Sequence, residues 1–109
     1  MKHAIILAAL IALPAMGSTA HAQTWAHNHP RRAEVNSRLD RQNARIHQGV
    51  VDGQLSHAQA RQLHADDRSI RAEERADAAV NDGHITRGEQ RQINAQENAN
   101  STAIYDERH

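Results

Sequence analysis

Histidine is the residue type in this sequence that is best suited to chemistry. The chain has nine histidines in 109 residues, and seven of them follow residue 22: His27, His29, His47, His57, His64, His84 and His109. Imidazole is the commonest protein ligand for transition metals, and carboxylates add the harder oxygen ligands that manganese accepts. The composition therefore favours a binder of manganese, zinc or copper.

Three local groups of residues have spacings that suit a metal ion. The segment His27-Asn28-His29 brings two imidazoles together, and the predicted turn Asp82-Gly83-His84 gathers oxygen and nitrogen ligands with Glu89 beyond it. A helix places residues three apart on one face, as for His64 and Asp67. The candidate metal ligands are His27, His29, His64, Asp67, Asp82, His84, Glu89 and Glu97. The alternative is that these are solvated polar side chains, since no pair has the His-x-x-x-His spacing of a helical zinc site.

Other chemistries find little support in the residue types. The chain has no cysteine, which excludes disulfides, thiolate metal sites and cysteine nucleophiles. It also lacks a glycine-rich phosphate loop, and none of its serines lies in a nucleophile elbow. Adjacent carboxylates such as Asp66-Asp67 and Glu73-Glu74 point to different sides of a helix. We therefore expect a protein that is not an enzyme.

The first 22 residues have the pattern of a Sec signal peptide. A positive start at Met1-Lys2-His3 precedes an apolar run over 4–13, and Ala20-His21-Ala22 offers a signal peptidase site. The run is too short to span a bilayer, so we expect cleavage after Ala22 and a periplasmic or secreted protein without a membrane span. Lys2 is the only lysine, which leaves 12 basic against 13 acidic residues after cleavage and argues against a nucleic-acid partner.

A repeat of thirty residues organises the rest of the chain. Residues 50–79 align with 80–109, and each half begins with an Asp-Gly turn followed by a hydroxyl residue and, three positions later, Gln or Glu. Asp-Gly can end a helix in the left-handed conformation, and the hydroxyl with the later Gln or Glu forms a capping box for the next helix. The predicted turn residues are Asp52, Gly53 and Ser56 in the first half, and Asp82, Gly83 and Thr86 in the second.

These signals predict an all-α fold in which two helix-turn-helix junctions separate three helices. A short flexible extension over 23–30 precedes a helical domain over 31–109, whose first helix runs from about Pro30 to Val50. Apolar residues at helical spacing define the inner faces: Val35, Leu39, Ile46 and Val50, then Ala60, Leu63 and Ile70, then Ile93 and Ile104. Four polar residues fall on the same faces: Asp67, Glu74, Glu97 and Asn100. A carboxylate there must be paired with arginine, wet, or bound to a ligand.

The two turns resemble the second half of an EF-hand loop. In that family the glycine makes the bend, the aliphatic residue two positions later pairs with its twin, and the last acid binds calcium. The matching positions are Asp52, Gly53 and Leu55 in one turn, and Asp82, Gly83, Ile85 and Glu89 in the other. Gln59 replaces the last acid of the first loop, and Gln48, Val50, Ala78 and Val80 occupy ligand positions. Calcium binding in the EF-hand manner is therefore not expected.

The region from Arg31 to His109 also resembles a group of small exported proteobacterial helical proteins. The shared pattern is a Gly-x-x-x-Gly-x-Leu-[Ser/Thr] turn, here with Gly49 and Gly53, a Gln/Arg-rich helix, an Asp-Gly turn and the ending Ile104-Tyr105-Asp106-Glu107-Arg108-His109. This resemblance implies export and helices but no chemistry. Two hypotheses follow: a non-enzymatic metal scavenger, buffer or carrier, or a helical interaction or chaperone-like module that binds a protein partner or forms a homodimer to complete a thin aliphatic core.

Overall fold

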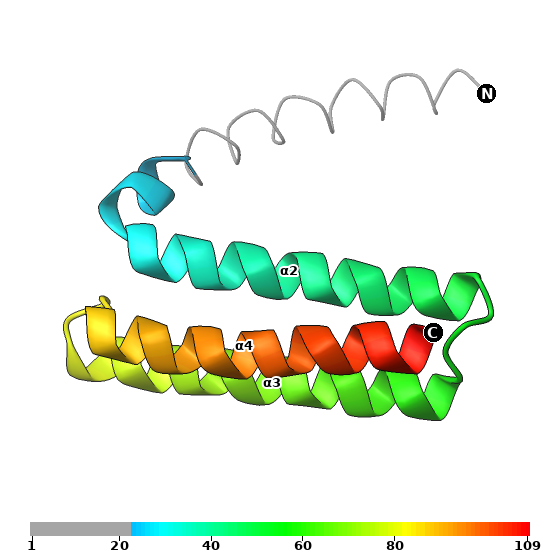
Figure 1. The fold of residues 1–109 in the computed structure, drawn as a ribbon. Coiled ribbons are helices and arrows are strands. Elements are labelled where there is room, and N and C mark those ends of the chain that lie inside the picture. The colour runs from blue at the N-terminus through cyan, green and yellow to red at the C-terminus, as the bar shows by residue number, and fades with distance from the viewer. Residues whose placement is uncertain (1–22) are drawn as a thin grey trace, which may run out of the picture. The chain divides into compact units, whose positions relative to one another are not determined.

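The computed structural model describes residues 23–109, and in this range every regular element is a helix (Figure 1). Residues 23–28 are helical, and they are followed by α2 (Pro30–Val51), α3 (His57–Val80) and α4 (Arg87–Arg108). The all-α class expected from the sequence is confirmed for this part of the chain. No helix within it is long and apolar enough to cross a membrane. The predicted signal peptide, residues 1–22, lies outside the described residues.

Residues 31–109 form one unit in which the chain runs along α2, returns along α3 and turns again into α4 (Figure 1). The turns between the helices are only five or six residues long (52–56 and 81–86), so each helix must lie against the next. The backbones of α3 and α4 approach most closely. By contrast, α2 lies farther from α3 and α4, and its long side chains make the contacts with them.

Capping boxes start both α3 and α4. The Ser56 hydroxyl accepts a hydrogen bond from the Gln59 N–H at 3.0 Å, and the Gln59 side chain accepts one from the Ser56 N–H. Thr86 and Glu89 repeat the arrangement thirty residues later. Each box satisfies N–H groups that a helix start leaves without partners, which typically stabilises the helix by about 1 kcal/mol. The repeat in the sequence is therefore a repeat of helix starts.

The turns end the preceding helices through glycine. The Gly49 carbonyl accepts hydrogen bonds from the N–H groups of Gln54 and Leu55, and Gly53 adopts φ of +76°. At the second turn both Asp82 (φ 55°) and Gly83 (φ 90°) are left-handed, and the Gly83 N–H donates to the Ala78 carbonyl. Aspartate tolerates this conformation better than most residues, which explains why Asp-Gly serves here.

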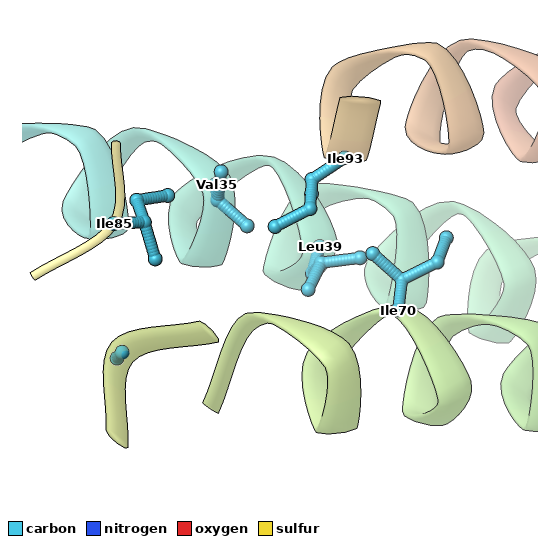
Figure 2. Close-up of a cluster of buried hydrophobic side chains, with 6 residues drawn as sticks. Val35, Leu39, Ile70, Ile85 and Ile93 are labelled. Carbon is cyan, nitrogen blue, oxygen red and sulfur yellow. The ribbon is translucent and has the colours of Figure 1, made fainter. Parts of the chain in front are cut away.

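Buried residues along each helix follow one another at spacings of three or four. This is the heptad spacing of helices that pack nearly parallel or antiparallel over their whole length. The apolar members form two clusters. One contains Val35, Leu39, Ile70, Ala78, Ile85 and Ile93 (Figure 2), and the other contains Ile46, Leu55, Ala60, Leu63 and Ile104. Figure 2 shows side chains from all three helices and from the second turn meeting in the first cluster.

Polar side chains tie α2 to both of its neighbours. Toward α3, the Arg71 guanidinium donates to Asn36 and forms an ion pair with Asp40 at 2.9 Å. Toward α4, the Arg45 guanidinium donates to the Ser101 hydroxyl at 2.8 Å. These contacts fix α2 along its length without close backbone approach.

Candidate functional site

A layer of buried polar side chains lies between the two apolar clusters. It consists of Gln42 from α2, Asp67 from α3, and Glu97 and Asn100 from α4, and each is at most 5% exposed. They occupy the heptad positions between Leu39 and Ile46, between Leu63 and Ile70, and between Ile93 and Ile104. The periodicity that buries the apolar residues therefore also buries these polar ones. We call this set the polar layer.

Two hydrogen bonds connect the polar layer across helices. The Gln42 amide donates to the main-chain carbonyl of Glu97 at 2.8 Å, and the Asn100 amide donates to Asp67 Oδ1. The remaining oxygens accept nothing from the described residues: Gln42 Oε1, Asp67 Oδ2, and both Glu97 carboxylate oxygens. Buried acceptors without donors are uncommon and costly. The polar layer therefore has acceptor capacity that a proton or a cation can fill.

The electrostatics of the polar layer are dominated by burial. The pKa of Glu97 is raised to about 7. Loss of solvation is the largest cause, and the nearby carboxylates of Glu34 and Asp67 also raise the pKa, while the charges of Arg38, 3.9 Å away, and Arg41 lower it. Burial likewise raises the pKa of Asp67 to about 6, against the opposing effect of the hydrogen bond from Asn100. Both carboxyls thus hold a proton more tightly than an exposed acid does.

Glu74 is equally buried but differently satisfied. Its carboxylate forms an ion pair and hydrogen bonds with Arg32, whose guanidinium also donates to the Gly83 carbonyl at 3.1 Å. This contact joins α2, α3 and the second turn. Arginine pairing, one of the three outcomes expected for an inner carboxylate, therefore applies to Glu74 and only at longer range to Glu97.

His64 and Asp67, which the sequence predicts to share one helix face, have different surroundings in the structure. His64 is half-buried, and its Nδ1 lies 2.8 Å from Asn43 Oδ1 on α2. Burial lowers the pKa of His64, as do the charges of Arg68 and His47. Asp67 instead faces the polar layer. The structure shows no contact between the two side chains.

At the second turn, the carboxylate of Glu89 takes part in local structure. It caps α4 and also accepts from the Asn81 amide at 3.1 Å. Asp82 and His84 are exposed. In the first turn, Asp52 accepts from the Gln48 amide and lies 3.7 Å from the Arg108 guanidinium.

His27 and His29 belong to the segment before α2. His27 is exposed. The His29 Nδ1 lies 3.0 Å from the Trp25 carbonyl, and its ring stacks on the Trp25 indole with centroids 4.7 Å apart. Within residues 23–109 no set of three or more histidine, aspartate and glutamate side chains comes together to hold a metal ion. Of the predicted ligands, only Asp67 and Glu97 are brought into one buried layer.

Gln42 belongs to this layer but was not predicted from the sequence. The inner face of α2 was defined from aliphatic residues alone, and these leave a gap of seven between Leu39 and Ile46. Buried spacings of three and four on the other helices place a residue in that gap, at position 42. The spacing of the buried residues therefore predicts that position 42 is buried, whereas the polar side chain of Gln42 does not.

A scan against protein-family models finds no match for this chain, and neither the curated proteins nor the solved structures yield a significant match.

Proposed function

We propose that this protein is a non-enzymatic binder of divalent metal ions and that the polar layer supplies its ligands. The observation that carries the proposal is the set of buried acceptor oxygens without donors: Asp67 Oδ2, both oxygens of Glu97, and Gln42 Oε1. Two carboxylates and an amide carbonyl form an all-oxygen set. Such ligands suit manganese, magnesium or calcium better than copper or zinc. Within the class expected from the sequence, manganese is therefore the first metal to test.

Charge supports the same assignment. When both carboxyls ionise, two negative charges are buried, and among residues 23–109 the only cationic group within 4 Å of them is the Arg38 guanidinium, 3.9 Å from Glu97. An uncompensated buried charge is strongly unfavourable, so the layer must take up protons or a cation. Because metal ligands must be deprotonated, the metal competes with these protons and binds more tightly as the pH rises.

The histidines form a separate part of the proposal. His27 and His29 are two residues apart and can capture a softer metal such as copper or zinc at the start of the mature chain. We assign His84, exposed beside the second turn, to the same supporting role. The proposed division is an interior oxygen site and an exterior imidazole site.

The experiment is a thermal unfolding series with manganese at pH 8 and pH 5. Wild-type protein should gain several degrees at pH 8 and much less at pH 5. The variants Asp67→Asn and Glu97→Gln should lose the gain, and the control Asp66→Asn, on the same helix but outside the polar layer, should keep it. Equal gains in wild type and both layer variants would overturn the interior site. Replacing His27 and His29 by alanine then tests the exterior site with copper.

A helical interaction module is the second candidate function. A shallow groove of about 340 Å³ runs between α3 and α4, lined by Asp66, Ser69, Ile70, Gln96, Ala99, Asn100 and Ala103. The small side chains of Ser69, Ala99 and Ala103 leave room for side chains from a helix of a partner or of a second copy. Light scattering on the purified protein tests this candidate, because a strictly monomeric, cooperatively folding chain would count against a homodimer.

Export completes the proposal. We assign residues 1–22 to a cleaved signal peptide and residues 23–109 to a periplasmic or secreted protein whose turns are EF-hand-like in sequence. Mass spectrometry of the protein from periplasmic and culture fractions should give the mass of a chain that begins at Gln23. Recovery of the full-length chain from the cytoplasm alone would contradict this assignment.

A further inference from the structure

Three arginines of α2 line a second groove, between α2 and α4. Arg38, Arg41 and Arg45 follow one another at spacings of three and four, which places them on one face of the helix. With Gln42 and Ser101 they line a groove of about 190 Å³. A water molecule takes up about 30 Å³ of liquid, so this volume admits a small polyatomic ion.

The hydrogen-bond partners of these arginines are uncharged. Arg38 donates to the amide oxygen of Asn98, Arg41 to the Ser37 hydroxyl at 3.2 Å, and Arg45 to the hydroxyl and carbonyl of Ser101. A hydroxyl or amide oxygen orients a guanidinium but does not neutralise it. These hydrogen bonds thus hold the planar groups in place without neutralising their charge.

One carboxylate approaches the group. In the described part of the chain, Glu97 is the only acid within 4 Å of any of the three guanidinium groups, and it lies 3.9 Å from Arg38 Nη1. Three other arginines of this unit form an ion pair with a carboxylate: Arg32 with Glu74, Arg71 with Asp40, and Arg108 with Asp52.

We propose that the groove lined by Arg38, Arg41 and Arg45 binds a small oxyanion of the phosphate or sulfate class. Guanidinium groups present parallel N–H donors that match the oxygens of such anions, and the Ser101 hydroxyl adds a neutral donor. Three positive groups around one groove also attract an anion more strongly than any single surface arginine does. The three arginines are not ligands in the metal proposal, and the inference does not depend on it, although Gln42 borders both sites.

Calorimetric titration of the protein with sulfate and with inorganic phosphate tests the groove. Arg41→Gln is the first variant, because Arg41 is exposed and bonds only within its own helix, so its replacement leaves the fold intact. Binding should weaken about tenfold or more in Arg41→Gln and in Arg45→Gln. The control Arg75→Gln removes the same charge from an exposed position on α3 and should bind as wild type does. No saturable binding, or equal loss in the control, would overturn the proposal.

Glu97→Gln provides an independent arm with the opposite sign. Removing the carboxylate beside Arg38 should strengthen sulfate binding at pH 8, whereas the same variant should weaken manganese binding if the metal proposal holds. The anion site is wrong if sulfate affinity is unchanged in Glu97→Gln and also unchanged in Arg41→Gln and Arg45→Gln. The metal site fails if manganese affinity is unchanged, so the two failures are distinguishable.

The source of the oxyanion is tested with vesicles. Binding to free phosphate that is lost in Arg41→Gln supports a soluble anion. Binding only to vesicles that contain phosphatidylglycerol, and not to vesicles of phosphatidylcholine, supports a lipid phosphate when Arg41→Gln abolishes it. Binding to neither probe would contradict the proposal.

Discussion

The side-chain amide of Gln42 donates a hydrogen bond of 2.8 Å to the main-chain carbonyl of Glu97, and both residues are buried. This bond joins α2 to α4 at the level where the two apolar clusters separate. A polar residue at a single buried heptad position can fix the register of packed helices. The relationship therefore links the alignment of α2 to the acidic residue on which the proposed chemistry depends.

Gln42→Ala should destabilise the fold by about 2 kcal/mol, because it removes the buried hydrogen bond to Glu97 and leaves space in the layer. Urea unfolding followed by circular dichroism measures this change. The control Gln92→Ala, at an exposed position of α4, should change the free energy of unfolding by less than about 0.5 kcal/mol. Equal effects of the two substitutions would show that Gln42 does not organise the layer.

Glu97→Gln should stabilise the metal-free protein at pH 8 and have little effect at pH 4. The folded pKa of Glu97, about 7, lies above its ordinary value of 4.5, so the native state binds the proton more tightly than the unfolded state. The free energy of unfolding of wild type therefore falls as the pH rises from about 4.5 to about 7. An amide does not ionise, and the expected gain at pH 8 is on the order of 2 kcal/mol. Unfolding curves at both pH values check this, and a variant less stable than wild type at pH 8 would refute it.

His64 should contribute the opposite pH dependence. Its pKa is lowered by burial and by the charges of Arg68 and His47, so the native state binds this proton less tightly than the unfolded state. The free energy of unfolding is therefore reduced as the pH falls below the ordinary histidine pKa of 6.5. His64→Gln should remove this loss. As the pH is lowered from 7 to 5, the free energy of unfolding of the variant should therefore increase more steeply than that of wild type, because the buried carboxyls gain protons in both proteins. A less steep rise would contradict the environment described for His64.

Gly49→Ala should destabilise the first turn. A Cβ at this position would lie 2.6 Å from Leu55 Cδ1, and Leu55 is buried in one of the apolar clusters. Overpacking of this kind typically costs about 1 to 3 kcal/mol. Gly88→Ala is the matched control, because its Cβ would meet nothing closer than 3.9 Å and alanine favours the helix by about 1 kcal/mol. Thermal melts of the two variants should therefore shift in opposite directions, and a stabilised Gly49→Ala would contradict the packing.

The sequence predicts helix boundaries well because local chemistry sets them. Ser56 and Thr86 cap their helices through residues three positions away, and the expected start at about Pro30 agrees with α2. The burial of Asp67 and Glu97 also follows from spacing within one helix. Spacing within one helix does not predict which residue of another helix pairs with each carboxylate. Arg32 pairs with Glu74, whereas Asn100 donates to Asp67. Those contacts depend on how α2 is aligned with α3 and α4, and the thirty-residue repeat does not include α2.

The contacts of the histidines could not be predicted from the sequence either. Their number predicts metal binding, but His64 lies beside Asn43 and His29 stacks on Trp25, so their positions are set by local contacts. A count of ligand types does not say whether their side chains meet. The buried acceptors without donors come from three different helices, so they depend on how these helices pack and cannot be predicted from the spacing within one helix.

Native mass spectrometry of wild type and the double variant Asp67→Asn/Glu97→Gln, titrated with manganese at pH 8 in excess magnesium, tests the central claim most directly. The account predicts that wild type retains one manganese ion and that the double variant retains none, while Asp66→Asn behaves as wild type. Identical manganese retention by wild type and the double variant, or only weak graded adducts in all three proteins, would contradict it.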